Sequence, residues 1–311
     1  MSKTGKLPET LIEAIVYFSD KDVANEFVAM LRWPDGPECP SCGSKELGYI
    51  STRRLWKCRN KECRRQFSVK VGTIFEDSPM PLDKWLASIW LIANSKNGIS
   101  SHELARSVGL TQKSAWFVLH RVRLAMQTGT FQRFSVEVEV DETFIGGRAR
   151  FMHKSVRARR ITGTGPGDKT AVFGVIERGG EVRASVVPDV HKRTLDPAVR
   201  QHVEPGASVY SDSAYAYNDL HDDYSHETVD HAVTYVNGQV HTNSIENFWS
   251  LLKRGLKGTY VSVQPFHLFR YLDERVFTFN ARTLTDLGRF SLVLSRVAGR
   301  RLTYDGLIGK A

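Results

Sequence analysis

Apolar and polar positions divide the chain into a helical first part and a second part that begins with a strand. Apolar residues recur at mixed helical spacing over 11–31, up to a turn at 34–36. A second helical block covers about 81–126. Strict alternation of apolar and polar residues then begins at Phe134 and continues to Asp141, which is typical of a strand. We therefore place the main domain boundary near residues 128–134.

The second part predicts a mixed sheet. A hairpin is expected because two strand-like segments, 170–177 and 182–187, flank the turn Arg178-Gly179-Gly180. The other predicted elements are a helix at 194–203, strands at 207–211 and near 226–230, and helices at about 243–255 and 265–280. Strand, hairpin, helix, strand, short strand and helix is the order of an RNase H-like mixed α/β domain. The basic stretch 148–169 is predicted to be a loop.

Composition and charge favour DNA as a partner. The chain has 43 Lys and Arg against 34 Asp and Glu, a formal charge of +9. Such an excess favours a polyanion, although many proteins without a nucleic-acid role are also basic. The longest apolar stretch, 85–93, is too short to span a bilayer, and no secretory segment is visible. We expect a cytoplasmic, nucleoid-associated protein.

Four cysteines predict a zinc site. They form two close pairs, Cys39 with Cys42 and Cys58 with Cys63. In a reducing compartment this spacing suits four thiolates around one tetrahedral Zn²⁺, and strands between the pairs would form a zinc ribbon. Because such a site has no open coordination position, the zinc is expected to be structural. The alternative is a set of four unligated buried thiols.

Residues 101–115 have the pattern of a helix-turn-helix. Ala105 permits close packing of two helices, Gly109 makes the turn, and Thr111 caps the second helix. One face of that helix is predicted to be buried: Ala115, Val118, Leu119, Val122 and Met126. The other face offers candidates for contact with a DNA groove: Gln112, Lys113, Ser114, Phe117 and Arg121. An ordinary helical hairpin would show the same spacing.

Three acidic residues are candidates for a catalytic metal site. Asp141 is predicted to end one strand, Asp212 to end another, and Glu246 to lie in the first turns of a helix. Three carboxylates so placed can hold two Mg²⁺ or Mn²⁺ ions for phosphoryl transfer. Lys253 follows Glu246 by two helical turns on the same face and can hold a DNA phosphate.

Each of these acids also has an ordinary interpretation. A single Asp is usually a solvated turn or capping residue. Residues 243–246 match a capping box, in which Glu246 would only satisfy amides of its own helix. Glu139 and Glu142 flank Asp141 and compete with it for the role, whereas His241 is expected to make a local hydrogen bond rather than bind a metal.

Three ordered blocks carry a resemblance to a known family. They are residues 138–147 (VEVDETFIGG), 209–218 (VYSDSAYAYN) and 241–255 (HTNSIENFWSLLKRG). Together with the upstream cysteines and helix-turn-helix, they resemble the Merlin-related bacterial insertion-sequence transposases over about residues 10–305. The resemblance implies an RNase H-like catalytic domain whose metal site has two Asp and a third carboxylate or amide. Asn243 and Asn247 are therefore alternatives to Glu246.

These observations predict a multidomain α+β protein. Its expected parts are an N-terminal helical segment (1–36), a zinc ribbon (37–78), a helix-turn-helix domain (79–130), an RNase H-like catalytic domain (131–283) and a C-terminal tail of unassigned role (284–311). The first domains would bind the terminal inverted repeats of a mobile element. Flanking or target DNA would contact the basic stretch through Arg148, Arg157, Arg159 and Arg160.

The expected reaction is cleavage at the element ends, followed by joining of the freed 3′-hydroxyl to target DNA. Pairing of two ends implies a homodimer or larger assembly by analogy. Two other functions remain open: a DNA-binding regulator with an inactive catalytic fold, and an RNase H-like nuclease without strand transfer.

Overall fold

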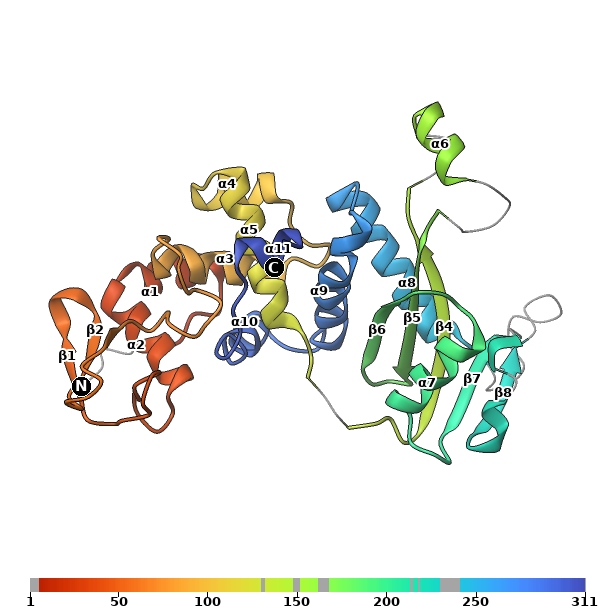
Figure 1. Ribbon diagram of the computed structural model, residues 1–311, viewed down its shortest axis with the longest axis horizontal. Coiled ribbons are helices and arrows are strands. Elements are labelled where there is room, and N and C mark those ends of the chain that lie inside the picture. The colour runs from red at the N-terminus through yellow and green to blue at the C-terminus, as the bar shows by residue number, and fades with distance from the viewer. Residues whose placement is uncertain are drawn as a thin grey trace. The chain divides into compact units, whose positions relative to one another are not determined.

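The structure, a computed structural model, forms two compact units (Figure 1). It describes residues 6–129, 132–147, 152–161, 168–212, 215–217, 219–229 and 241–310. One unit consists of Met1–Gln127 with Thr283–Ala311, and the other of Thr128–Arg282. Within the described part of the chain, no helix is long and apolar enough to cross a membrane.

The first unit begins with two helices where the sequence predicted one helical block. They are α1 (Leu11–Ser19) and α2 (Lys21–Arg32). The break lies at Asp20, whose carboxylate accepts hydrogen bonds from the amides of Asp22 and Val23 and so caps α2.

Three short antiparallel strands follow in the order β1-β2-β3. They are β1 (Leu47–Ile50), β2 (Leu55–Cys58) and β3 (Gln66–Phe67), with a 3-10 turn, η1 (Ser51–Arg53), between the first two. The strands lie between and beside the cysteine pairs, as expected of a zinc ribbon. An aromatic cluster supports them, because Trp56 packs against Trp33 at a centroid distance of 5.1 Å and against Phe67 at 6.1 Å.

The predicted helix-turn-helix is formed by α4 (Ser101–Val108) and α5 (Gln112–Met126), which follow α3 (Leu82–Asn94). Gly109 has φ +65°, the left-handed conformation that a residue without a side chain adopts most easily. Thr111 caps α5 by accepting a hydrogen bond from the Ser114 amide at 3.2 Å. The predicted inner face of α5 is buried throughout.

Arg121 departs from the prediction. It was expected on the outer face of α5 as a groove contact, but it is 4% exposed. Its guanidinium donates to the carbonyl oxygens of Ile74 (2.8 Å), Glu76 (2.7 Å) and Leu302 (3.2 Å). The expectation was wrong because the segment after the zinc ribbon and the C-terminal segment cover this side of α5. Arg121 is a structural residue that joins them.

The C-terminal segment has a packing role within the first unit. Helix α10 (Asp286–Leu294) places Phe290 at a centroid distance of 5.0 Å from Trp90 and 5.7 Å from Phe18. Phe290 itself is fully buried, and a short helix, α11 (Tyr304–Ile308), follows. The apolar residues after Ala281 therefore complete the core around α1 and α3.

The second unit contains a five-stranded sheet in the order β6-β5-β4-β7-β8 (Figure 1). The strands are β4 (Glu137–Ile145), β5 (Thr170–Glu177), β6 (Val182–Val187), β7 (Ser208–Asp212) and β8 (Ser225–Val229). Strands β4, β5 and β6 are antiparallel neighbours, whereas β7 runs parallel to both β4 and β8. This is the mixed sheet predicted for an RNase H-like domain.

Helices cover both faces of the sheet. On one face, α7 (Lys192–His202) packs against Val138 and Val140 of β4. On the other, α8 (Asn243–Gly255) and α9 (Leu268–Asn280) pack against Val172 of β5 and neighbouring apolar residues. The short 3-10 turns are η3 (Tyr215–Tyr217), η4 (Leu220–Asp222) and η6 (Pro265–His267), and η5 (Leu256–Tyr260) is a π-helical turn.

The basic stretch predicted as a loop contains a helix, α6 (Lys154–Arg160), beyond the ends of β4 and β5 (Figure 1). The loop prediction was therefore wrong over these residues, which include no glycine or proline. Arg157 and Arg159 are exposed on α6. Arg148 and the side chain of Arg160 lie outside the described residues.

We expect Arg121→Ala to destabilise the first unit by about 3 kcal/mol, because three buried carbonyl oxygens lose a charged donor. Urea unfolding, followed by the fluorescence of the first unit's tryptophans, measures this. Lys113→Ala is the matched control at the exposed start of the same helix and should change stability by less than about 0.5 kcal/mol. Equal, small effects of both variants would show that Arg121 does not join the segments.

Candidate carboxylate site and zinc-binding cysteines

Asp141 and Asp212 are neighbours because of the register between β4 and β7. Glu139 pairs with Tyr210, and Asp141 and Asp212 each lie two residues beyond this last pair on their strands. The charge of Asp212 acts on the Asp141 carboxyl group. Adjacent strands lie about 4.8 Å apart, which brings the two carboxylates close together. Asp212 ends its strand as predicted. Asp141 does not, because β4 continues to Ile145.

The Asp141 carboxyl group lies in an acidic, largely buried environment. Burial, above all, raises its pKa to about 7, with further contributions from the nearby Glu142 and Asp212 charges. Its Oδ1 accepts a hydrogen bond from the Glu142 amide at 2.8 Å, and its Oδ2 accepts one from Nε1 of Trp249 at 2.9 Å. The orientation of Asp141 is therefore fixed from β4 and from α8.

A glycine on β5 makes the hydrogen bond between Trp249 and Asp141 possible. Gly174 on β5 stands directly opposite Asp141. A Cβ atom at Gly174 would lie 2.5 Å from the Trp249 ring, closer than atoms can approach. The indole therefore lies across β5 only because this position has no side chain.

Glu142 belongs to the opposite side of β4 from Asp141. Its Oε2 accepts a hydrogen bond from the Tyr217 hydroxyl at 2.6 Å. Burial raises the pKa of Glu142, and burial together with the Glu142 charge raises that of Tyr217. Glu142 is thus held by a hydroxyl donor next to the carboxylate pair, while Asp141 faces α8.

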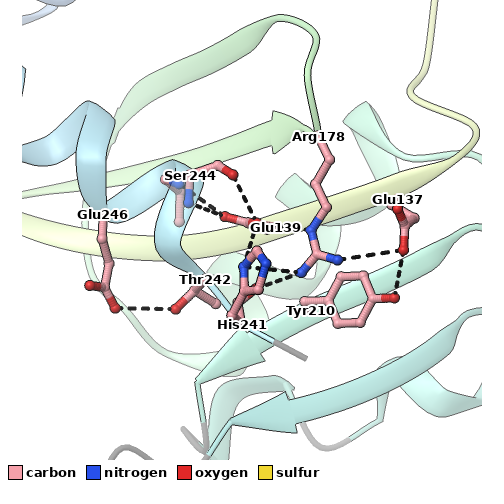
Figure 2. Close-up of polar contacts among 9 residues, drawn as sticks. Glu137, Glu139, Arg178, Tyr210, His241, Thr242, Ser244 and Glu246 are labelled. Atoms are coloured by element: carbon pink, nitrogen blue, oxygen red, sulfur yellow. Dashed lines mark hydrogen bonds and ion pairs between the residues drawn. The ribbon is translucent and has the colours of Figure 1, made fainter. Parts of the chain in front are cut away.

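Glu139 fixes the start of α8 (Figure 2). Its side chain is fully buried, and its Oε2 accepts hydrogen bonds from the amides of Ser244 (2.8 Å) and Ile245 (3.0 Å). The Ser244 hydroxyl donates to Oε1 at 3.0 Å. A strand carboxylate therefore serves as the N-terminal cap of the helix that carries Glu246, where the helix dipole also favours negative charge.

Arg178 balances the charge of Glu139. Its Nε donates to Glu139 at 2.9 Å and its Nη2 donates to the His241 carbonyl oxygen at 2.8 Å. The guanidinium also lies 3.9 Å from the centre of the Tyr210 ring, and the Tyr210 hydroxyl donates to Glu137 (Figure 2). His241 contacts Glu139 and Arg178 through Nδ1, each at 3.3 Å, in agreement with a local hydrogen-bonding role.

Glu246 is not the partner in a capping box. The N-cap residue is Thr242, and the first amides of α8 bond to Glu139 instead. The Glu246 side chain is exposed and accepts a hydrogen bond from the Thr242 hydroxyl at 3.3 Å. Figure 2 shows this side chain extending from the first turns of α8 to Thr242. The predicted capping box of residues 243–246 is therefore wrong in its N-cap, because α8 is capped at Thr242 and not at Asn243.

Lys253 lies two turns further along α8 and is half-buried. Burial lowers its pKa, while the charge of Asp141 acts in the opposite direction. The ammonium group of Lys253 therefore interacts electrostatically with the Asp141 carboxyl group.

The four cysteines come together as predicted. All four Sγ atoms lie within 4.8 Å of one another, with Cys39–Cys63 at 3.7 Å and Cys42–Cys58 at 3.6 Å. A tetrahedral zinc with Zn–S bonds of about 2.3 Å requires about 3.8 Å between sulfurs. The donor set and its spacing thus fit Zn²⁺. Among the described residues, the four cysteines are the only group of three or more potential metal ligands that lie so close together. Asp141, Asp212 and Glu246 do not form such a group.

The candidate DNA-contact residues of α5 are exposed at its first turn. Gln112 donates to the Ser101 hydroxyl at 2.9 Å, and the Lys113 ammonium lies 5.2 Å from the centre of the Tyr304 ring. Ser114 is exposed beside them, whereas Phe117 is half-buried and lies 4.3 Å from the Arg121 guanidinium.

Sequence reasoning did not identify the residues that hold the site, namely Glu139, Arg178, Gly174, Trp249 and Tyr217. The sequence did indicate one of these roles. Glu139 lies two residues before Asp141 in the alternating strand, so both side chains are on the same face and contact the same neighbouring element. The contact of Trp249 with Gly174 had no comparable signal, because it joins positions distant in the chain.

Comparison with known proteins agrees with this arrangement. Residues 133–280 match the ISXO2-like transposase domain and residues 19–66 match the transposase zinc-ribbon domain. The chain is 29% identical over 253 residues to an uncharacterized protein in transposable element ISH50 of Halobacterium salinarum, covering 77% of this chain and 84% of that protein. It is 33% identical over 101 residues to an uncharacterized transposase-like protein of Haemophilus influenzae, covering 32% of this chain and 81% of that protein. No solved structure matches.

A transposase domain and a transposase zinc ribbon in one chain imply a protein that binds DNA, and the transposase domain indicates an enzyme that cleaves it. The cysteine cluster of the zinc ribbon indicates a structural zinc. The chain belongs to the family of insertion-sequence transposases with an ISXO2-like transposase domain and a transposase zinc ribbon.

Proposed function

We propose that this transposase binds the terminal inverted repeats of its element, cleaves the DNA at the element ends and joins the freed 3′-hydroxyl to target DNA. The observation that carries the proposal is the proximity of Asp141 and Asp212 on neighbouring strands, with Glu246 on α8, the helix that also contacts Asp141 through Trp249. An intact set of acids favours an active enzyme over a regulator with an inactive catalytic fold.

The chemistry of the acidic residues fits divalent metal ions. Asp141 and Asp212 offer hard oxygen donors, and burial, with the charges of Glu142 and Asp212, raises the pKa of Asp141. Asp141, Asp212 and Glu246 would hold Mg²⁺ or Mn²⁺. When bound, two such ions would supply the charge stabilisation of an in-line phosphoryl transfer.

The chain's own residues would orient the reacting DNA. Trp249 holds the Asp141 carboxylate in one direction through Oδ2. Lys253 would bind a phosphate of the strand at the site as a point charge. Water would attack the phosphodiester at the element end and release a 3′-hydroxyl, which would then attack a target phosphodiester.

DNA recognition would involve both units. Gln112, Lys113 and Ser114, at the exposed start of α5, would enter a groove of the terminal repeat. Arg157 and Arg159 on α6, with Arg148 and Arg160 of the same stretch, would contact phosphates of flanking or target DNA. Because two ends must be brought together, we propose a homodimer or larger assembly on DNA.

Asp141→Asn should reduce strand cleavage by about 10³-fold or more, since a metal ligand contributes several kcal/mol of transition-state stabilisation. Binding of the same DNA should persist, and stability should not fall, because the change removes a buried and repelled carboxylate. The assay is Mg²⁺-dependent nicking of a plasmid that carries the repeats bordering this gene. Asp212→Asn and Glu246→Gln should behave alike.

The matched control for this series is Asp222→Asn, an exposed acid of the same unit. Asn243→Ala and Asn247→Ala test the alternative third ligands. Full cleavage by Asp141→Asn would refute the assignment. Loss of cleavage with Asn247→Ala but not with Glu246→Gln would assign the third metal-binding position to Asn247 instead of Glu246. Joining of a labelled 3′ end to a plasmid distinguishes a transposase from a simple nuclease.

Glu139→Gln should destabilise the second unit by about 3 kcal/mol, because the half-buried Arg178 loses its closest acid and α8 loses its charged cap. Thermal unfolding measures the change. Glu227→Gln, on the exposed surface of β8, is the control and should have an effect below about 0.5 kcal/mol. If Glu139→Gln lowers the stability of the second unit by no more than the control does, Glu139 does not anchor α8.

Cys42→Ser should lower the bound zinc from one ion per chain and unfold the ribbon, because a closed metal site contributes folding free energy directly. Metal analysis and circular dichroism report the two effects, while Mg²⁺-dependent cleavage of non-specific DNA should persist. Ser41→Ala, in the same exposed turn, should retain zinc. A fully folded ribbon in zinc-free wild-type protein would contradict the assignment.

A further inference from the structure

The second unit contains a cavity of about 560 Å³ at the C-terminal end of α8. Its wall is formed by the end of β4, the base of the α6 segment, the end of α8 and the residues after the π-helical turn η5. Lys253 lies in this wall, so the cavity adjoins the position proposed for a DNA phosphate.

Three lysines line the cavity: Lys169, Lys253 and Lys257. The charges of Lys169 and Lys257 both act on Lys253, as does that of Asp141. Three ammonium groups around one hollow create a positive potential that favours an anion. A phosphate group of DNA is an anion that the proposed function brings to this place.

The cavity is larger than a phosphate group requires. Pockets that enclose a whole small molecule have about 300–1,000 Å³, and this one falls within that range. Its wall also includes apolar side chains such as Val263 and Leu256. The size and lining therefore fit a phosphate together with the sugar and base attached to it.

One hydrogen-bond acceptor in the wall supports a base over a bare phosphate. Asp168 lines the cavity, and its Oδ2 is buried without a hydrogen-bond partner among the described residues. A phosphate oxygen would be repelled by this carboxylate. A nucleobase carries N–H donors that can satisfy it.

Val261, also in the cavity wall, has the conformation expected of a functional position. Its φ is +61°, which is rare for a β-branched residue, and the residue is 81% exposed. It directly follows η5, and π-helical turns are frequent at functional sites. An exposed apolar side chain beside a cavity can occupy the space that an unstacked base leaves in DNA.

We propose that this cavity receives an unpaired nucleotide from the DNA strand bound at Asp141. Lys169, Lys253 and Lys257 bind its phosphates, Asp168 accepts a hydrogen bond from its base, and Val261 contacts the base step from which it came. This inference rests on the proposed function, because it assumes that DNA lies at the carboxylates.

The test compares two duplexes of one sequence, fully paired or with a single unpaired thymine. The full-length, zinc-loaded protein is titrated with each in Ca²⁺, so that binding is measured without cleavage. Because extruding a paired base costs a few kcal/mol, the bulged duplex should bind at least about tenfold more tightly. Equal affinities would overturn the proposal.

Two variants connect the preference to the cavity. Lys257→Ala and Val261→Ala should each reduce the ratio of the two affinities by at least about threefold, while Arg254→Ala should leave it unchanged. Arg254 is the matched control because it is exposed at the end of α8, directly before η5, and does not line the cavity. Thermal unfolding confirms that each variant is folded. An identical ratio in all three variants would refute the role of the cavity.

The position of the base is tested by photo-crosslinking. A 4-thiothymidine in the bulge should attach to residues 256–263 or 168–169, and crosslinks confined to the first unit would exclude the cavity. These binding experiments are independent of catalysis. If Mg²⁺-dependent cleavage fails while the bulge preference and crosslink persist, only the proposed reaction is refuted.

Discussion

The buried ion pair between Glu139 and Arg178 determines where the carboxylate site can form. Glu139 has no exposed side-chain surface, so its charge must be satisfied by the chain itself. Arg178 supplies one cation, and the first amides of α8 and the Ser244 hydroxyl supply further donors. Removing one partner of such a pair would leave an uncompensated buried charge, which is why the start of α8 is confined to this point of the sheet.

The sequence predicted most helices and strands, but it did not predict what packs against β4, the strand that carries Asp141. The hairpin was predicted with the observed bounds, and α8 with the observed start and end. Alternation in β4 normally indicates one face toward water. In the structure, the polar face of β4 is covered by α8, and its acids are balanced by Arg178 and helix amides. Periodicity reports which residues share a face, but it does not report what covers that face.

The errors at Asp141 and Arg121 have a related cause. Asp141 looked like the end of a strand because the apolar residues at 138 and 140 stop there, yet β5 continues to pair with β4 up to Ile145. Arg121 looked exposed because a charged residue on a helix usually is, and the segments that bury it are distant in the chain. Long-range packing decided both positions. The cysteine cluster was predictable because its chemistry is set by local spacing.

Because Glu139 fixes the start of α8, it also determines where the side chains carried by this helix lie. Its rise of about 1.5 Å per residue puts Glu246 and Lys253 about 10 Å apart along the axis. Trp249 lies between them and bonds to Asp141 across Gly174, which fixes the rotation of the helix as Glu139 fixes its start. Two contacts with β4 thus determine both the position and the rotation of α8. Glu246, a proposed metal ligand, lies near the start of this helix, and Lys253, which lines the cavity proposed to bind DNA, lies near its end, so both belong to a single rigid element.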